Sequence, residues 1–327
     1  MSTVPETRAS SVPLAITTAG PVMADVARRH KLGGEARPLS ELYVPLWREG
    51  GVTLATLELD SLEDAGLLLA EIAESDGELR LAGRSQADEL PGAVQIVLAP
   101  SALAFAGAES AYLWAGLGAA VCCLAYNLRN PFCDGVGEVR DGGLSAAGRA
   151  LVRCLDRLGI VIDVSHLSDA SFADVVEASE GRMVASHSNA RALCPNPRNV
   201  TDAQAIEIAS RGGVVAVSAH PTLLAERDAS MQTYIDHVCY FADLVGVEHV
   251  GMGADFIGYA LDIVAPKLAA SDPTSKIYRA DLLVAPDLGS YEDLRHVPRL
   301  LRERGMTDED VRRVAADNYL RVLGVLE

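Results

Sequence analysis

Short apolar runs alternate with longer amphipathic stretches along most of the chain. Strands of a parallel sheet read as nearly continuous apolar runs, because helices cover the sheet and bury both sides of each strand. We expect eight strands of this kind, at Pro13–Thr18, Val52–Leu59, Val94–Ala99, Ala119–Tyr126, Ile160–His166, Arg182–Ser188, Val214–His220 and His249–Asp255.

The stretches between these runs carry helix signals. Ser145 precedes a segment whose apolar residues fall on one helical face, and Gly159 ends it. Thr201 and Gln204 have the spacing of a capping box. Eight strands in strand–helix alternation predict an α/β fold, a closed (β/α)8 TIM-like barrel, with a doubly wound open sheet as the alternative.

One barrel accounts for the whole length, because such barrels fill about 250 residues or more as a unit. We expect a flexible N-terminus over residues 1–12 and a single barrel domain over residues 13–327. The segment 257–290 is too long for an ordinary strand–helix turn and is predicted to form a lid or an interface. Two amphipathic helices are expected after it.

Composition excludes several classes of partner. The formal net charge of −17 disfavours nucleic acids and anionic lipid surfaces. The uncharged stretch 110–128 is split by Gly116 and Gly118, which favours a buried helix and strand over a membrane span. The first residues lack the pattern of a signal peptide, and the six cysteines lack CxxC spacing, so a cytoplasmic protein with reduced thiols is expected.

Polar residues at the strand ends are the candidate site. His166, His187, His220 and Asp255 lie at or near the ends of four predicted strands, and in a barrel these ends open on one face. Imidazole and carboxylate groups suit metal binding and proton transfer. The alternative is that each histidine is a packed, hydrogen-bonded core residue, and that interpretation is favoured for His30, His237, His249 and His296.

Several longer motifs support a resemblance. They are GLSAAGRALVRCLDRLGIVIDVSH, SHSNARALCPNPRN, TDAQAIEIASRGGVVAV, DHVCYFADLVGVEHVGMGADF and DNYLRVLG. In content and order they resemble the renal (membrane) dipeptidase family, zinc-dependent hydrolases of the amidohydrolase type. The resemblance covers about half of the chain and implies a barrel of the metal-dependent-hydrolase type.

The resemblance also implies roles for four residues. His166 and His187, which are 21 residues apart, stand at the two histidine ligands of one zinc ion. Arg198 stands at the contact with the substrate carboxylate, and Asp255 at the acidic group that handles protons.

Other family positions are changed. Thr18 and Gly20 stand where the family has a His-x-Asp pair, Ala99 or a near neighbour replaces a glutamate that bridges two metal ions, and Tyr126 replaces a histidine. Two imidazoles fall short of the three protein ligands of catalytic zinc. We therefore expect no bound metal. The alternative is a single weakly bound zinc on His166 and His187, completed by His220, Asp255 or Glu109.

The resulting hypothesis is a diverged, metal-independent acid/base enzyme acting on a dipeptide-like or amino-acid-derived small molecule, in specialised biosynthesis. Its catalytic residues would be His166, His187, Asp255 and Tyr126, and its substrate-binding residues Arg198 and His220. Two alternatives stay open: a catalytically inactive binding or scaffold protein, and a zinc dipeptidase with substitute ligands. Family analogy implies a homodimer.

Overall fold

The computed structural model describes residues 12–82, 92–272, 276–279 and 281–325, and the counts of strands and helices refer to these ranges. Nine parallel strands form one sheet in the order β3-β4-β2-β1-β9-β8-β7-β6-β5. Their bounds are Leu14–Ile16 (β1), Val52–Leu59 (β2), Leu79–Leu81 (β3), Val94–Pro100 (β4), Val121–Cys123 (β5), Val161–Asp163 (β6), Met183–Ala185 (β7), Val214–Val217 (β8) and Val250–Met252 (β9).

The sheet closes into a barrel between β4 and β5. Ser101 and Cys123 form a parallel bridge there, and the backbone N–H of Ala120 donates to the carbonyl of Leu98 at 3.1 Å. Strand β3 pairs with β4 alone, outside the ring of eight. The predicted α/β barrel is therefore confirmed, and each of the eight expected runs contains a strand.

Most strands are shorter than the apolar runs that predicted them. In the run ending at His166, for example, β6 ends at Asp163; Val164 still donates its N–H to the carbonyl of Val184 at 2.8 Å, and Ser165 and His166 then leave the sheet. Strand β3 was not predicted, since three residues show no measurable alternation.

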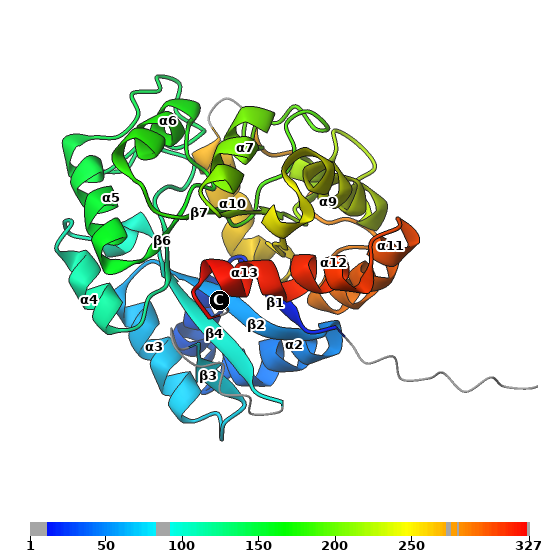
Figure 1. The fold of residues 1–327 in the computed structure, drawn as a ribbon. Helices are drawn as coiled ribbons and strands as arrows, with labels where there is room; N and C mark the ends of the chain where they lie inside the picture. The colour runs from blue at the N-terminus through cyan, green and yellow to red at the C-terminus, as the bar shows by residue number, and fades with distance from the viewer. Residues whose placement is uncertain (1–11, 83–91, 273–275, 280, 326–327) are drawn as a thin grey trace, which may run out of the picture.

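Helices surround the ring of strands (Figure 1). The predicted caps are present: Ser145 accepts a hydrogen bond from Gly148, Thr201 and Gln204 form the capping box, and Gly159 ends its helix with a φ of 66°. The α-helices are Val22–Arg28 (α1), Val44–Gly50 (α2), Leu62–Ala73 (α3), Ser110–Gly116 (α4), Ala146–Leu158 (α5), Asp169–Ala178 (α6), Asp202–Ser210 (α7), Pro221–Leu224 (α8), Met231–Val245 (α9), Leu261–Ser271 (α10), Val297–Glu303 (α11), Asp308–Arg312 (α12) and Asn318–Val322 (α13).

Shorter helical turns complete the chain. The two C-terminal helices expected from the sequence are each divided: the 3-10 turn η6 (Tyr291–His296) precedes α11, and the π-turn η7 (Arg313–Asp317) joins α12 to α13. Pro298 explains the first division, because proline is accommodated in the first turn of a helix but not in its interior. The remaining turns are η1 (Arg29–Gly33), η2 (Leu39–Tyr43), η3 (Ala102–Ala104), η4 (Val247–His249) and η5 (Gly258–Ala260).

The N-terminus, the cysteines and the uncharged stretch 110–128 were also the subject of sequence predictions. The proposed flexible N-terminus, 1–12, falls almost wholly outside the described residues. All six cysteines are free thiols, and five of them are buried. Over the described ranges, the helices are too short or too polar to cross a bilayer, and the stretch 110–128 forms α4 and β5 as expected.

The C-terminal motif holds one end of the barrel. Helix α13 lies across the ring in Figure 1, and the hydroxyl of its Tyr319 is 2.7 Å from that of Thr56 on β2. The buried amide of Asn318 donates at 2.8 Å to the carbonyls of both Val247 and Val250. This motif therefore connects the end of the chain to strands far away in the sequence.

Asn318→Ala is expected to destabilise the fold, because the carbonyls of Val247 and Val250 would each lose a hydrogen bond, although the Val250 N–H still donates to Val247. A typical hydrogen bond contributes about 0.5–1.5 kcal/mol, so we expect the free energy of unfolding to fall by about 1–3 kcal/mol. Urea unfolding followed by circular dichroism measures the change, with the exposed Arg312→Ala as the control. Equal stability of the two variants would contradict this role of Asn318.

Candidate functional site

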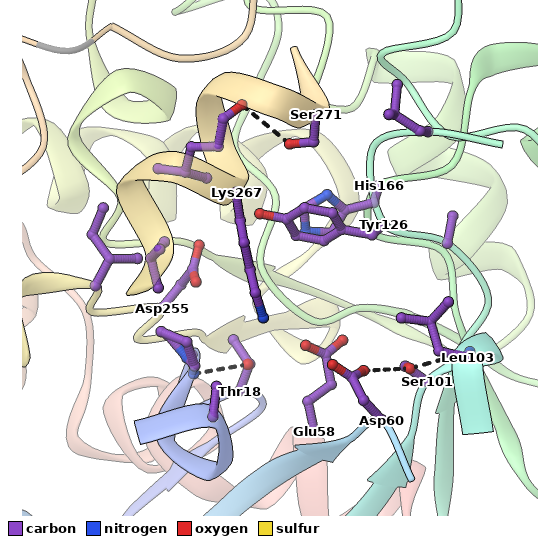
Figure 2. Close-up of a pocket in the computed structure, with 18 of the residues that line it drawn as sticks. Thr18, Glu58, Asp60, Ser101, Leu103, Tyr126, His166, Asp255, Lys267 and Ser271 are labelled. Carbon is purple, nitrogen blue, oxygen red and sulfur yellow. Dashed lines mark hydrogen bonds between the residues drawn. The ribbon is translucent and has the colours of Figure 1, made fainter. Parts of the chain in front are cut away.

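A cavity of about 440 Å³ opens at the carboxyl ends of the strands. Residues from the loops after β1, β2, β4, β5, β6, β7, β8 and β9 line it, together with α10 from the segment predicted as a lid. Figure 2 shows its polar side chains converging from these elements. The sequence-predicted residues in the lining are Thr18, Gly20, Tyr126, His166, His187, His220 and Asp255.

Two buried imidazoles form the centre of the site. The Nε2 atoms of His166 and His187 lie 2.9 Å apart, at hydrogen-bonding distance. His166 Nδ1 donates to Asn127 Oδ1 at 2.7 Å, and this orientation of Asn127 is fixed because its amide nitrogen donates to the hydroxyls of Ser271 and Tyr278. Both histidines are less than a tenth exposed.

The other side of His187 continues into a chain of hydrogen bonds. Its Nδ1 is 2.6 Å from Ser186 Oγ, which is 2.5 Å from a carboxylate oxygen of Asp163. The four hydrogen bonds from Asp163 through Ser186, His187 and His166 to Asn127 need four hydrogens. The serine hydroxyl and two neutral imidazoles supply three, so with both rings neutral one of the four contacts has no hydrogen and the chain has room for one further proton.

The surroundings keep both imidazoles from carrying a positive charge. Burial lowers the pKa of His166 and of His187 well below the usual value, and the charge of Arg198 lowers both further. The hydrogen-bonded chain is therefore better suited to passing a proton than to holding an isolated imidazolium.

The side chains at the mouth of the barrel do not supply the ligands of a two-zinc site. Within the described part of the chain, no group of three or more His, Cys, Asp or Glu side chains is arranged to hold a metal ion. Thr18 and Gly20 line the cavity where the resemblance implies a His-x-Asp pair, and neither offers a zinc donor. Glu109, one of the substitute ligands considered, is exposed and lies outside the lining. The residues at the implied ligand positions therefore do not fit a pair of zinc ions.

A buried cation lies behind the cavity wall. Arg198 is 3% exposed and donates from Nη1 to Ser188 Oγ at 2.8 Å, whereas its Nε and Nη2 have no partner in the described structure. A buried charge without a counter-ion is costly, and a guanidinium fork matches a carboxylate. The side chain thus has unused donors for an anionic ligand.

His220 offers another unused donor. Its Nδ1 accepts a hydrogen bond from the backbone N–H of Thr222, which leaves the ring hydrogen on Nε2. That Nε2 is buried and unpartnered among the described residues, although the ring lines the cavity. Burial lowers the pKa of His220 to about 3, so the ring donates as a neutral group.

Asp255 provides a carboxylate on the same face. It has a φ of 56°, in the left-handed region that aspartate enters more readily than most residues, and it accepts from Ser218 Oγ at 3.3 Å. Burial raises the pKa of Asp255 to about 6, although the charge of Arg198 opposes the shift. This places its proton exchange close to neutral pH.

Tyr126 packs against the imidazole pair. Its ring centroid is 4.8 Å from that of His166, and Figure 2 shows the two rings overlapping. Burial raises the pKa of its phenol well above the usual value, so the hydroxyl stays protonated. The residue after it, Asn127, is the direct partner of His166 and was not identified from the sequence.

Sequence reasoning missed four charged residues of the lining: Glu58, Asp60, Arg129 and Lys267. Figure 2 shows Lys267 reaching from α10 towards Glu58 and Asp60. The alternation of side chains along β2 could have identified Glu58. Ala55, Leu57 and Leu59 pack in the core that includes the surrounding helices, so the residues between them, Leu54, Thr56 and Glu58, point into the barrel.

The histidines interpreted as structural lie outside the cavity lining. His237 is buried between α9 and its neighbours, with Nδ1 accepting from Ala190 N and Nε2 bonded to the carbonyl of Leu224. His249 contacts the carbonyl of Gly213, His30 contacts that of Glu35, and His296 is exposed.

Comparisons with known proteins agree with the fold and the motifs. The sequence profile of membrane dipeptidases (peptidase family M19) matches residues 87–265, more than half of the chain. Dipeptidase aclJ from Aspergillus oryzae is 32% identical over 247 residues, which cover 72% of this chain and 53% of that protein. The chain spans about half the length of the curated relatives it matches.

Solved structures of related proteins have the same barrel fold. An amidohydrolase from Pseudomonas aeruginosa is similar with a TM-score of 0.77 and 26% identity, covering 86% of this chain and 90% of that one. A metallopeptidase from Rhodobacter sphaeroides, solved with a phosphinate mimic of the dipeptide L-Ala-D-Ala, has the same fold at 23% identity, with a TM-score of 0.76 and coverage of 97% and 100%. The chain belongs to the membrane dipeptidase family, peptidase family M19.

Proposed function

We propose that this protein is a metal-independent acid/base enzyme that acts on a dipeptide-like or amino-acid-derived small molecule. The observation that carries the proposal is the donor set beside His166 and His187: among the described residues, no group of three or more His, Cys, Asp or Glu side chains is arranged to hold a metal ion. Catalytic zinc needs three protein ligands, and the two imidazoles, whose Nε2 atoms lie 2.9 Å apart, supply two. The changed residues at the other ligand positions support the same conclusion.

The substrate class follows from the unused donors. Arg198 offers Nε–H and Nη2–H, and His220 offers Nε2–H, to a ligand oxygen. A carboxylate accepts hydrogen bonds from such donors and would supply the counter-charge that buried Arg198 lacks. The dipeptidases among the relatives make a dipeptide-like molecule the class to test first.

Proton transfer is the chemistry that the remaining groups support. Above about pH 6, Asp255 is ionised and accepts a proton from the substrate. The chain from Asp163 to His166 has room for one further hydrogen, so it can take up and return a proton at the cavity that His166 and His187 line. Elimination, cyclisation, isomerisation and hydrolysis each need such transfers, and Tyr126 adds a neutral donor beside His166.

A catalytically inactive binding protein is the second candidate. It is favoured by one observation: both nitrogens of His166 and of His187 have hydrogen-bond partners, as packed structural histidines do. Under this alternative the cavity, Arg198 and His220 would bind a ligand without changing it.

Metal analysis distinguishes the proposal from a zinc dipeptidase with substitute ligands. The purified full chain is expected to contain well under one equivalent of zinc, since two imidazoles do not complete a zinc site. Turnover of its substrate should survive chelation and fall at least about 100-fold in His187→Gln and Asp255→Asn, the loss typical of a missing general acid or base. Two zinc ions per chain, with chelator-sensitive cleavage of L-Ala-D-Ala, would contradict the proposal.

Arg198→Lys tests the carboxylate contact. Lysine keeps the charge but lacks the planar fork, so we expect substrate binding to weaken at least about tenfold, equivalent to 1.4 kcal/mol. The matched control is Arg191→Lys, an arginine that pairs with Asp169 outside the cavity lining. Unchanged affinity in Arg198→Lys, measured by calorimetry, would exclude this role.

The raised pKa of Asp255 predicts a pH-dependent cost in stability. The folded state holds the Asp255 proton more tightly than the unfolded state, so the free energy of unfolding falls as the pH rises from about 4 to about 6. Asp255→Asn removes this term and should melt at a higher temperature than wild type at pH 8 but not at pH 4. Equal melting temperatures at pH 8 would show that the Asp255 carboxylate is not destabilised by burial.

A further inference from the structure

Glu58 lies directly across the sheet from a changed family position. In the pairing of β2 with β4, the Cα partner of Glu58 is Ala99. The resemblance places a metal-bridging glutamate at Ala99 or a near neighbour. Neighbouring residues of paired strands point to the same side of a sheet, so a carboxyl group is present on β2 at the level where β4 has only a methyl group.

The side chain of Glu58 reaches the cavity and not the helical shell. Its inward-facing neighbours on β2 are Leu54, in the core inside the barrel, and Thr56, which contacts Tyr319. Glu58 is the next inward position and lines the cavity. Figure 2 shows its carboxyl group below the tip of Lys267, with Asp255 entering the same cavity from the β9 side.

Groups from several elements face Glu58. They are the carboxyl groups of Asp60, Asp163 and Asp255, the Cys123 thiol, which hydrogen-bonds to Glu58, and the ammonium of Lys267. In the described ranges Glu58 forms no ion pair within 4.0 Å, whereas Asp60 is engaged by Ser101 Oγ at 2.6 Å. Glu58 is therefore the carboxyl group left available to a ligand on this side.

We propose that Glu58 is a catalytic residue of this cavity and that it donates a proton to a substrate oxygen while Asp255 removes a proton from the substrate. This inference rests on the proposed function and deepens it by naming the acid. It goes beyond the residues that the resemblance supplies, because no family position corresponds to Glu58 in the motifs above.

Electrostatics supports this division of roles. Burial raises the pKa of Glu58 to about 8, the charge of Asp60 adds to the shift, and the Cys123 thiol opposes it. At neutral pH Glu58 is thus mainly protonated, whereas Asp255, with a pKa of about 6, is mainly ionised. Two carboxyl groups in one cavity with separated pKa values form an acid and a base.

The transfer is balanced without a further reactant. Asp255 takes the proton from an atom next to a carbonyl group, and the bond to that proton breaks. The electron pair of that bond forms a new double bond to the carbonyl carbon, while the π bond of the carbonyl group breaks and its electron pair binds the proton that leaves Glu58. The products are the enol-type substrate, ionised Glu58 and protonated Asp255. Return of the Asp255 proton to a different atom or face of the enol, and of the hydroxyl proton to Glu58, gives the isomerised product and restores both groups.

Infrared spectroscopy of the full-length protein tests the acid directly. Wild type at pH 7 is expected to show the carbonyl stretch of a protonated carboxyl group, which disappears in Glu58→Gln and titrates near pH 8. Gln is isosteric and neutral, so it preserves the packing, and circular dichroism verifies the fold. Glu63→Gln, a glutamate whose side chain is 71% exposed, is the matched control and should leave the band unchanged.

Kinetics provides the second readout. On a substrate that wild type turns over, Glu58→Gln should lower kcat at least about 100-fold with a smaller change in KM, and Glu58→Asp should restore part of the rate. Identical infrared bands in wild type and Glu58→Gln would overturn the role of Glu58, even if the protein contains no zinc and depends on Asp255. Two zinc ions in wild type would instead overturn the proposed function, whatever the band shows.

Discussion

Closure of the ring between β4 and β5 is the constraint on which the site depends. The hydrogen bond from Ala120 to Leu98 and the bridge between Ser101 and Cys123 bring the first half of the barrel against the second. Asp255 follows β9, two strands from β2 in the sheet, whereas closure is what brings the end of β6, and with it His166, into the cavity that Glu58 lines. The core fixes the strand register, and the register fixes which side chains meet at the mouth.

The cavity that results is rich in buried groups whose partners are incomplete. Arg198 and His220 retain unpaired donors among the described residues, and burial raises the pKa values of Glu58 and Asp255. Such an arrangement is unfavourable for folding, since desolvation of each group is only partly compensated. Sites that bind and transform ligands tolerate this cost because the ligand supplies the missing partners.

The sequence predicted the barrel well because apolar runs and caps are local signals. It also predicted the convergence of His166, His187, His220 and Asp255, because strand ends meet at one face. Contacts that depend on the direction of a side chain could not be predicted from the sequence as readily. The engagement of Asn127 with His166, for instance, depends on a loop conformation, and the seam between β4 and β5 joins residues whose pairing has no local signature.

The changed ligand positions were visible in the sequence, whereas their consequence was not. Thr18, Gly20 and Ala99 led to the expectation that no metal is bound, and the structure adds the 2.9 Å contact between the two imidazoles and a carboxyl group opposite Ala99. Glu58 lies one residue before the end of β2 and has no histidine-like signal of its own, although the period of two along β2 directs its side chain inward.

The central claim is that His166 and His187 share a hydrogen and do not share a metal ion. Nitrogen-15 NMR of histidine-labelled protein tests it most directly, by measuring the scalar coupling across an N–H···N hydrogen bond. The account predicts a coupling between the two Nε2 nuclei that persists when one equivalent of zinc is added. Loss of the coupling, with both Nε2 resonances moving to metal-bound positions, would contradict it.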